Sequence, residues 1–410
     1  MKIGLYIHHS TIKAGGIFTY SIGVLRLLLS SEDIEKIYLI YSPGIRNGLS
    51  DIIKHKKIES VEIDREIFYV KYPFMISFFL HDIYLLIKNY FPESNSFNFL
   101  KKLSFFINPY RFKLDRINFD ILHVPRQHSP VYNLKRPIII TMHDVQELHF
   151  PEFFSSQERL QRAFDNKKSI EESKHIIVSF DHIKNDLIKY FRVNNDKVSV
   201  CPPPFSSDWF AHNKFTDLNE IKTRYNLKEE FILYPAATWP HKNHLALIEA
   251  LNILRQKGKN IQLICTGNKK EYFKDVIQKR LIEFNLQEEI KFLGIVPESD
   301  LISLYKLTRL VVIPTLYEAG SGPLYEAMRY SIPVICSNVT SLPDTMNNDE
   351  FVFNPNDPAE ISEMIKKGIA DEEFRKRNVE NSRLRMEIFS KNDYTSNFIN
   401  TYKKIINKSS

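Results

Sequence analysis

Two glutamates eight positions apart, Glu318 and Glu326, lie on either side of a turn that contains two glycines. The apolar run Leu310–Ile313 before them is typical of a buried parallel strand, and Pro323 stands where prolines open helices. Free backbone N–H groups at such a helix start, together with the helix dipole, suit a diphosphate. Because the two carboxylates would accept hydrogen bonds from hydroxyl groups of a sugar and a ribose, the pattern predicts a sugar-nucleotide site.

The alternative for this segment is two glutamates on a solvated helix face. A second strand-like run, Pro333-Val-Ile-Cys-Ser337, follows the helix, and the order strand, turn, helix, strand favours the ligand site. The residues of the turn that we expect to bind the donor are Gly320, Ser321, Gly322, Pro323 and Leu324.

A lysine supplies the second chemical group of the predicted site, a positively charged ammonium. Lys242 lies shortly after the apolar run Phe231–Tyr234 and offers a mobile cation to a diphosphate whose charge grows as a glycosidic bond breaks. The alternative is an exposed lysine that opens a helix. His241 and His244 flank it closely and are further candidates for phosphate contacts.

A histidine ends another predicted strand, Ile138–Met142. Ligands of open α/β sheets bind at the carboxyl ends of the strands, so His143 is placed to face the ligand crevice. Asp144 either joins it or caps the following turn. Gly15 and Gly16 follow the first strand, where they form either a tight turn or a loop that approaches the ligand.

Strand-like runs that alternate with amphipathic helical patterns position these residues. Such alternation predicts an α/β fold with parallel, doubly wound sheets. Pro202-Pro-Pro204 interrupts the alternation, so we place a domain boundary near residue 205, with domains over 1–205 and 206–388. The first set of runs is Ile3–Ile7, Ile37–Tyr41, Ile121–Val124, Ile138–Met142, Ile176–Ser179 and Val198–Val200, and the second is Phe231–Tyr234, Ile261–Cys265, Ile290–Leu293, Leu310–Ile313 and Pro333–Ile335.

Composition narrows the classes of partner. A chain of 410 residues with a formal charge of +7 would suit nucleic acid, an anionic membrane or phosphorylated small substrates. No nucleic-acid-binding motif accompanies the charge, so we expect no nucleic-acid partner. The three cysteines stand in strand-like contexts without metal-ligand spacing, and we expect reduced core residues and no metal site.

Residues 66–116 are rich in aromatic and aliphatic side chains, with interspersed lysines and arginines. Phe74 to Phe91 approaches membrane-spanning length, but His81, Asp82 and Lys88 would each be costly inside a bilayer. Two alternatives remain: peripheral docking on an anionic inner membrane, and ordinary packing in the core around an acceptor cleft. The start of the chain, Met1–Ile7, resembles a strand rather than a signal peptide, which favours a cytoplasmic protein.

The spacing of Glu318 and Glu326 in this setting resembles the Glu-x7-Glu signature of the retaining, nucleotide-sugar-dependent glycosyltransferases of family 4. The resemblance implies the GT-B fold: two facing Rossmann-like domains, with a C-terminal helix, here 389–410, that crosses back onto the first. It also implies that Glu318 binds the sugar, that Glu326 holds the ribose and that no metal is required.

The resemblance assigns further residues. His143 would meet the donor sugar, Asp144 would accompany it, and the loop with Gly15 and Gly16 would approach the donor phosphates or the acceptor. Val296 would lie near the base. The sequence departs from the family at Ala237, where most members carry a phosphate-binding arginine.

The activity implied is transfer of a hexose from a nucleoside-diphosphate sugar to a glycan or lipid-linked acceptor in surface polysaccharide synthesis. The catalytic residues would be His143, Glu318 and Lys242. GDP-mannose is the first expectation for the donor and UDP-glucose the second. The alternatives are an inactive GT-B relative that serves as a nucleotide-binding subunit and a sugar-nucleotide epimerase; a phosphorylase would need a pyridoxal lysine context, which the sequence lacks.

Overall fold

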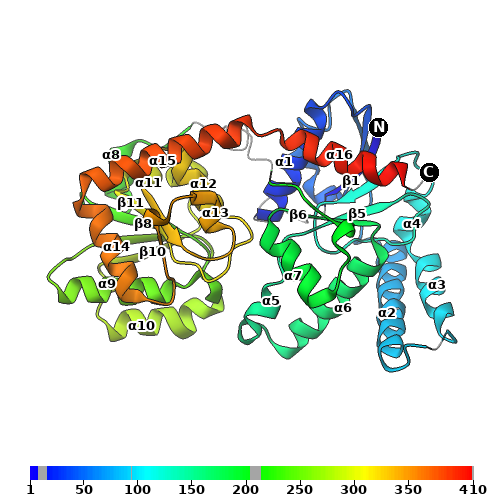
Figure 1. Ribbon diagram of the computed structural model, residues 1–410, viewed down its shortest axis with the longest axis horizontal. Coiled ribbons are helices and arrows are strands. Elements are labelled where there is room, and N and C mark those ends of the chain that lie inside the picture. Colours follow the sequence, from blue (N-terminus) through cyan, green and yellow to red (C-terminus); the bar gives the residue numbers. More distant parts are fainter. Residues whose placement is uncertain (8–15, 94, 204–213, 409–410) are drawn as a thin grey trace. The chain divides into compact units, whose positions relative to one another are not determined.

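The computed structural model describes the chain except for residues 8–15, 94, 204–213 and 409–410. The chain forms two compact units: the first is Met1–Phe205 with Asp393–Ser410, and the second is Ser206–Asn392. Each unit consists of a parallel sheet flanked by helices (Figure 1). This arrangement confirms the predicted α/β class.

The first unit contains a seven-stranded sheet in the order β3-β2-β1-β4-β5-β6-β7. All of its strand pairs are parallel, and the strand order reverses between β1 and β4, which pair in the register Leu5 to His123. The strands are β1 Lys2–Ile7, β2 Lys36–Tyr41, β3 Ile58–Glu62, β4 Ile121–Val124, β5 Ile138–Met142, β6 His175–Val178 and β7 Val198–Val200.

Helices connect these strands, and three of them lie in the long connection between β3 and β4. The α-helices of the first unit are α1 Gly16–Ser30, α2 Phe68–Tyr90, α3 Asn98–Ile107, α4 Pro109–Leu114, α5 Gln146–His149, α6 Ser156–Glu172, α7 Asp181–Phe191 and α16 Tyr394–Asn407. The shorter 3-10 turns are Pro43–Leu49, Pro151–Phe153 and Asn195–Lys197.

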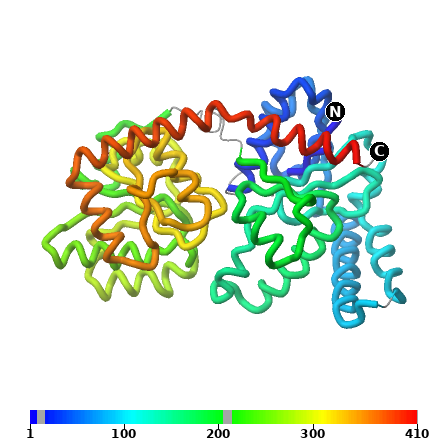
Figure 2. Tube along the Cα trace, viewed as in Figure 1, coloured from blue at the N-terminus to red at the C-terminus, as the bar shows by residue number. Residues whose placement is uncertain are grey.

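The C-terminal helix α16 packs on the first unit, where both ends of the chain lie (Figure 2). The hydroxyl oxygen of its buried Tyr402 lies 2.7 Å from Nδ1 of His123. The Nε2 atom of the same histidine lies 2.9 Å from Oγ1 of Thr141. The helix begins at Tyr394 rather than at residue 389, because Asp393 caps it and residues up to Lys391 belong to the preceding helix.

The second unit contains a six-stranded parallel sheet in the order β10-β9-β8-β11-β12-β13, which reverses between β8 and β11. Its strands are β8 Phe231–Pro235, β9 Gln262–Thr266, β10 Ile290–Gly294, β11 Leu310–Ile313, β12 Val334–Ser337 and β13 Val352–Phe353. Its α-helices are α8 Leu218–Arg224, α9 His244–Gln256, α10 Gln278–Glu283, α11 Glu298–Leu307, α12 Gly322–Arg329, α13 Leu342–Met346, α14 Pro358–Ala370 and α15 Glu372–Lys391. Three further turns span Pro240–Lys242, Phe273–Ile277 and Asp349–Phe351.

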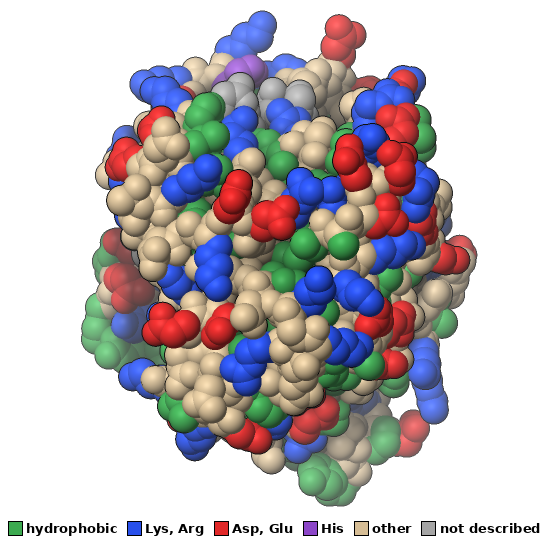
Figure 3. Space-filling view, turned by 90° about the vertical axis from the view of Figure 1, so that its left-hand side faces the viewer, with side chains coloured by type: hydrophobic (Ala, Val, Ile, Leu, Met, Phe, Trp, Pro, Cys, Tyr) green, Lys and Arg blue, Asp and Glu red, His purple; other side chains and the backbone are tan. Residues whose placement is uncertain are grey.

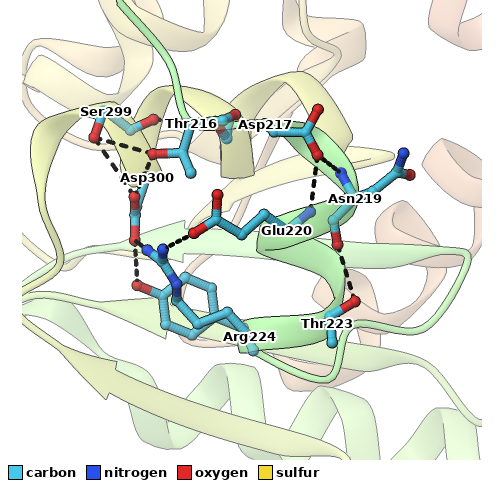
Figure 4. A network of polar contacts seen from close by, with 10 residues as sticks. Thr216, Asp217, Asn219, Glu220, Thr223, Arg224, Ser299 and Asp300 are labelled. Carbon is cyan, nitrogen blue, oxygen red and sulfur yellow. Dashed lines mark hydrogen bonds and ion pairs between the residues drawn. The ribbon is translucent and has the colours of Figure 1, made fainter.

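A polar network fastens α8 to α11 (Figure 4). Asp217 caps α8 by accepting hydrogen bonds from the first-turn amides of Asn219 and Glu220. Arg224, at the other end of α8, pairs with Asp300 of α11, and the hydroxyl of Thr216 donates to the same carboxylate at 2.6 Å. The short helix is therefore anchored at both ends.

Helix α2 is longer than the predicted apolar segment and packs against the helices α3, α4 and α6 with only one face. Its buried residues are Ser77, His81, Tyr84 and Leu85. The opposite face is exposed and apolar, and among the described residues this is the one helix long and apolar enough to cross a membrane by length and composition. The exposed large side chains of this helix are Phe68, Tyr69, Tyr72, Met75, Ile76, Phe79, Leu86 and Tyr90.

Candidate functional site

The second unit brings Lys242 and Glu318 together at the point where the strand order reverses. Lys242 follows β8 and Glu318 follows β11, and these strands are neighbours in the sheet. The Nζ atom of Lys242 lies 2.6 Å from Oε2 of Glu318, and both side chains are largely shielded from solvent. Ligands of doubly wound sheets bind at such reversals, so the pair occupies the expected place for a ligand.

The backbone around Lys242 is held by three side-chain contacts. The hydroxyl of Tyr234 donates to the carbonyl of Lys242 at 2.8 Å. Asn243, in the left-handed region with φ 56°, donates through Nδ2 to the carbonyls of Pro314 and Pro355. These contacts therefore fix the backbone that carries the Lys242 side chain.

The two histidines beside Lys242 have different positions. The carbonyl of His241 accepts hydrogen bonds from the amide of Leu316 and the hydroxyl of Thr315, which joins the loops after β8 and β11. Burial, with the charge of Lys242, lowers the pKa of the His241 side chain to about 3, so the ring is neutral at pH 7. It therefore adds no positive charge for a phosphate.

His244 lies in the core rather than at the phosphate turn. Its ring is buried between the aromatic rings of Tyr234 and Phe292, with centroids at 4.8 and 5.5 Å. Burial lowers its pKa to about 3. The structure does not bring His244 to the predicted site, because its ring packs between Tyr234 of β8 and Phe292 of β10.

The loop that carries Ala237 is packed tightly against the end of β9. Gly267 has φ 116°, and a Cβ atom there would lie 2.7 Å from the backbone of Ala236 and Ala237. On the same side, the amide of Lys270 donates to Oγ1 of Thr238 at 2.7 Å. The Nζ atom of Lys270 lies 4.4 Å from the ring centroid of Trp239, a cation that the sequence motifs do not indicate.

The glycine turn opens α12 as the sequence predicts, and Pro323 occupies its first turn. The amides of Gly320, Ser321 and Gly322 have no acceptor among the residues that the structure describes. The amide of Leu324 differs, because it donates to the carbonyl of Ser321 at 3.2 Å, and Pro323 has no N–H. The free donors are therefore the three residues before the proline.

Glu326 lies beside the first turn of its own helix. The hydroxyl of Tyr305 donates to its Oε2 at 2.6 Å, while a Cβ atom added at Gly322 would lie 4.0 Å from Oε1. Burial raises the pKa of Glu326, and the hydrogen bond from Tyr305 opposes that rise. One carboxylate oxygen is therefore fixed, and the sequence gives no sign of the tyrosine that fixes it.

Val296 lies in the loop between β10 and α11, half-buried. Gly294 at the end of β10 has φ 75°, and its carbonyl accepts from the amide of Gly267 at 2.7 Å. The loops after β9 and β10 are thereby joined at the carboxyl edge of the sheet.

In the first unit, His143 follows β5 and is half-buried. Its Nε2 donates to the carbonyl of Pro125 at 3.1 Å, and the ring of Tyr20 meets it edge-on with centroids 4.8 Å apart. Burial lowers the pKa of His143, so Nδ1 remains an acceptor. Asp144 forms an ion pair with Arg162 at 3.8 Å instead of capping a helix.

Gly16 begins α1, and a Cβ atom added there would meet no atom within 4 Å. Packing against the described residues therefore does not require glycine at this position. Gly15 lies outside the described residues. Within the described part of the chain, no group of three His, Cys, Asp or Glu side chains is arranged to hold a metal ion.

Comparison with known proteins gives matches over both units. The family model of glycosyl transferases group 1 matches residues 216–385, and that of glycosyltransferase family 4 matches residues 80–209. The O-antigen chain mannosyltransferase B of Escherichia coli is 28% identical over 285 residues, 69% of this chain and 74% of that protein. The serotype-specific mannosyltransferase WbdA of Escherichia coli is 27% identical over 251 residues, which are 60% of this chain and 31% of WbdA.

Solved structures have the same fold over nearly the whole chain. A glycosyltransferase from Rickettsia africae has a TM-score of 0.65 at 17% identity, with 99% of this chain and 98% of that chain covered. Anabaena HepE in complex with UDP and glucose has a TM-score of 0.66 at 15% identity, with 98% and 100% covered. The likeness at these identities concerns the fold alone.

Proposed function

Because this chain belongs to glycosyltransferase family 4 and has the GT-B fold, we propose that it moves a hexose from a nucleoside-diphosphate sugar to a glycan or lipid-linked acceptor. The observation that carries the proposal is the pair of Lys242 and Glu318 at the reversal of strand order, beside the free amides of the turn before α12. The ammonium group of Lys242 and the backbone N–H groups suit the phosphates of a sugar diphosphate. The carboxylate of Glu318 suits the hydroxyl groups of its sugar.

In this proposal the diphosphate binds the amides of Gly320, Ser321 and Gly322 and the ammonium of Lys242. The anomeric C–O bond breaks, and the electron pair of that bond goes to the departing diphosphate. Fixed donors that face this developing charge stabilise the transition state. Because helix and lysine neutralise the phosphates, the reaction needs no metal ion.

The acceptor hydroxyl attacks from the side that the diphosphate leaves, and its proton passes to a diphosphate oxygen, so the anomeric configuration is retained. Glu318 accepts hydrogen bonds from sugar hydroxyls. Glu326 binds the ribose through Oε1, while its other oxygen is held by Tyr305.

Mannose from GDP-mannose is the first candidate donor, because several relatives are named mannosyltransferases, two of them of O-antigen chains. UDP-glucose is the second, since HepE was solved with UDP and glucose. The acceptor would be a growing surface polysaccharide, and the enzyme would act in the cytoplasm or at the inner membrane.

The experiment is a panel of nucleotide sugars incubated with the protein and membrane extract without added metal, with release of nucleoside diphosphate as the readout. We expect release from one donor, its loss in Glu318→Gln, and its retention in the matched control Glu288→Gln, an exposed glutamate of the same unit. Nucleotide binding without release from any donor would favour an inactive, nucleotide-binding relative. Isomerisation of the donor without an acceptor would indicate an epimerase.

A further inference from the structure

A cavity of about 380 Å³ lies in the first unit at the reversal of its strand order. Tyr6 near the end of β1 and Arg126 just after β4 contribute to its wall, and Arg65, which precedes α2, adds a second guanidinium. Such a reversal is the general position of ligand crevices in doubly wound sheets. The residues of the predicted donor site do not line this cavity.

The two arginines supply positive charge to the wall of the cavity. No carboxylate of the described residues lies within ion-pair distance of either guanidinium. Arg65 donates to the hydroxyl of Tyr6, and its guanidinium lies 4.1 Å from the ring centroid of Phe74. Burial lowers the pKa of Arg126, and the neighbouring charge of Arg65 acts in the same direction.

Two aspartates also line the cavity, and a buried lysine offsets part of their charge. The Nζ atom of Lys168 lies 2.6 Å from Oδ1 of Asp82 and 3.6 Å from Oδ1 of Asp165. The two carboxylates share this one lysine, and the charge of Asp165 also acts on Arg126. Arg65, Arg126 and Lys168 place three positive charges against these two negative ones, and the net positive charge favours an anionic ligand.

The other wall of the cavity is apolar and continues onto the surface. Phe74, Met75, Phe78 and Phe79 of α2 line it, and Met75 and Phe79 are 55% and 63% exposed. Along the same helix, Phe68, Tyr72 and Ile76 are also exposed at helical spacing. An anion-binding cavity therefore opens beside an uncovered apolar helix face.

We propose that this cavity binds the phosphate or diphosphate of an amphiphilic acceptor, with the hydrocarbon chain lying on the exposed face of α2. The inference rests on the proposed function only for the role of this ligand as acceptor. A free glycan would leave the apolar face uncovered, and a neutral lipid would leave the net positive charge of the cavity without a counter-ion. One molecule with a phosphate and a hydrocarbon chain satisfies both surfaces.

The test is titration calorimetry of the full chain with farnesyl diphosphate, farnesol and inorganic diphosphate. We expect farnesyl diphosphate to bind about tenfold more tightly than either of the other two probes. Arg126→Gln should weaken its binding about tenfold, which is about 1.4 kcal/mol, whereas the exposed control Arg136→Gln should not. Phe79→Ser should weaken binding of farnesyl diphosphate but leave that of inorganic diphosphate unchanged; Phe79 is exposed, so this variant should fold.

Two outcomes would overturn the inference. One is equal affinity of the parent chain and Arg126→Gln for farnesyl diphosphate. The other is weakening by Lys242→Gln but not by Arg126→Gln, since the diphosphate would then occupy the predicted donor site. Release of nucleoside diphosphate from sugar donors is measured separately, so a failure of this inference is distinct from a failure of the proposed function.

Discussion

Lys242 and Glu318 form an ion pair in the second unit, with 2.6 Å between Nζ and Oε2, although they are 76 positions apart in the chain. The contact joins the loops after β8 and β11, the two strands between which the sheet order reverses. Each side chain offsets the charge of the other in a largely shielded place. Neither residue can therefore be replaced without affecting its partner.

Replacing Lys242 should lower catalysis more than donor binding. We expect Lys242→Met to reduce kcat about a hundredfold to a thousandfold, as does loss of one donor that faces developing charge. Lys242→Arg should retain part of the activity, because arginine keeps the positive charge but carries a planar guanidinium in place of the compact ammonium group. Steady-state release of nucleoside diphosphate measures both. A kcat within twofold of the parent for Lys242→Met would remove this lysine from the reaction.

The same pair should be visible in stability. In a double-mutant cycle with Lys242→Met and Glu318→Gln, we expect the free energies of unfolding to deviate from additivity by about 0.5 to 3 kcal/mol. The reason is that each single change leaves one charge unpaired while the double change leaves none. Urea denaturation measures the four proteins, and additive effects would show that the pair contributes nothing to folding.

Tyr305 is predicted to act through Glu326. Because its hydroxyl holds Oε2 of Glu326 at 2.6 Å, Tyr305→Phe should free the carboxylate to rotate. We expect the KM for the donor to rise between about twofold and tenfold with kcat nearly unchanged, which is the range for one lost hydrogen bond. The matched control is Tyr90→Phe, at an exposed position of α2. A fall in kcat at unchanged KM would argue against a role in ribose binding.

Structure that depends on neighbouring residues could be predicted from the sequence, whereas side-chain contacts between distant segments could not. The turn before α12 could be predicted, because a proline and two glycines after an apolar run have few other structures. The position of Lys242 near this turn follows from the parallel sheet, in which carboxyl ends share one edge. The contact of Tyr305 with Glu326 could not be predicted, since it depends on how α11 packs beside α12.

The missed elements have physical reasons of their own. Strand β3 has the sequence Ile-Glu-Ser-Val-Glu at a sheet edge and is half-exposed, so it lacks the apolar run of the inner strands. Strand β13 has two residues. The apolar composition of α2 fits a core helix and a surface helix equally, and only the structure shows that one face is uncovered.

Acidification should destabilise the first unit through His123. Burial lowers its pKa to about 3, and the charge of His143 acts in the same direction, whereas the ordinary value is 6.5. The unfolded chain therefore binds the proton first, and stability present above pH 6.5 is lost as the pH falls from 6.5 towards 3. One such group contributes a slope of up to about 1.4 kcal/mol per pH unit.

The measurement for His123 is the change of unfolding free energy between pH 6.5 and 4. We expect a shallower slope in His123→Gln than in the parent chain, whatever the stability of the variant at neutral pH. Gln157→Asn, at an exposed position of α6 without a titrating group, is the control and should keep the parent slope. Identical slopes in parent and His123→Gln would show that this ring is not the acid-sensitive group.

The exposed apolar faces of α2 and α3 should hold the protein on anionic membranes. Phe79 of α2 and Phe106 of α3 are 63% and 62% exposed. By contrast, Lys and Arg side chains lie among those of Asp and Glu on the face that Figure 3 shows, which is at the left in Figure 1. We expect co-sedimentation with vesicles of phosphatidylcholine and phosphatidylglycerol, weakened about tenfold in the double variant Phe79→Ser, Phe106→Ser because two aromatic side chains no longer enter the interface. Ile282→Ser, which removes from α10 an apolar side chain that is 54% exposed, should bind like the parent. Binding of all three proteins to the same extent would mean that these faces do not contact lipid, since only burial of the replaced side chains distinguishes the variants.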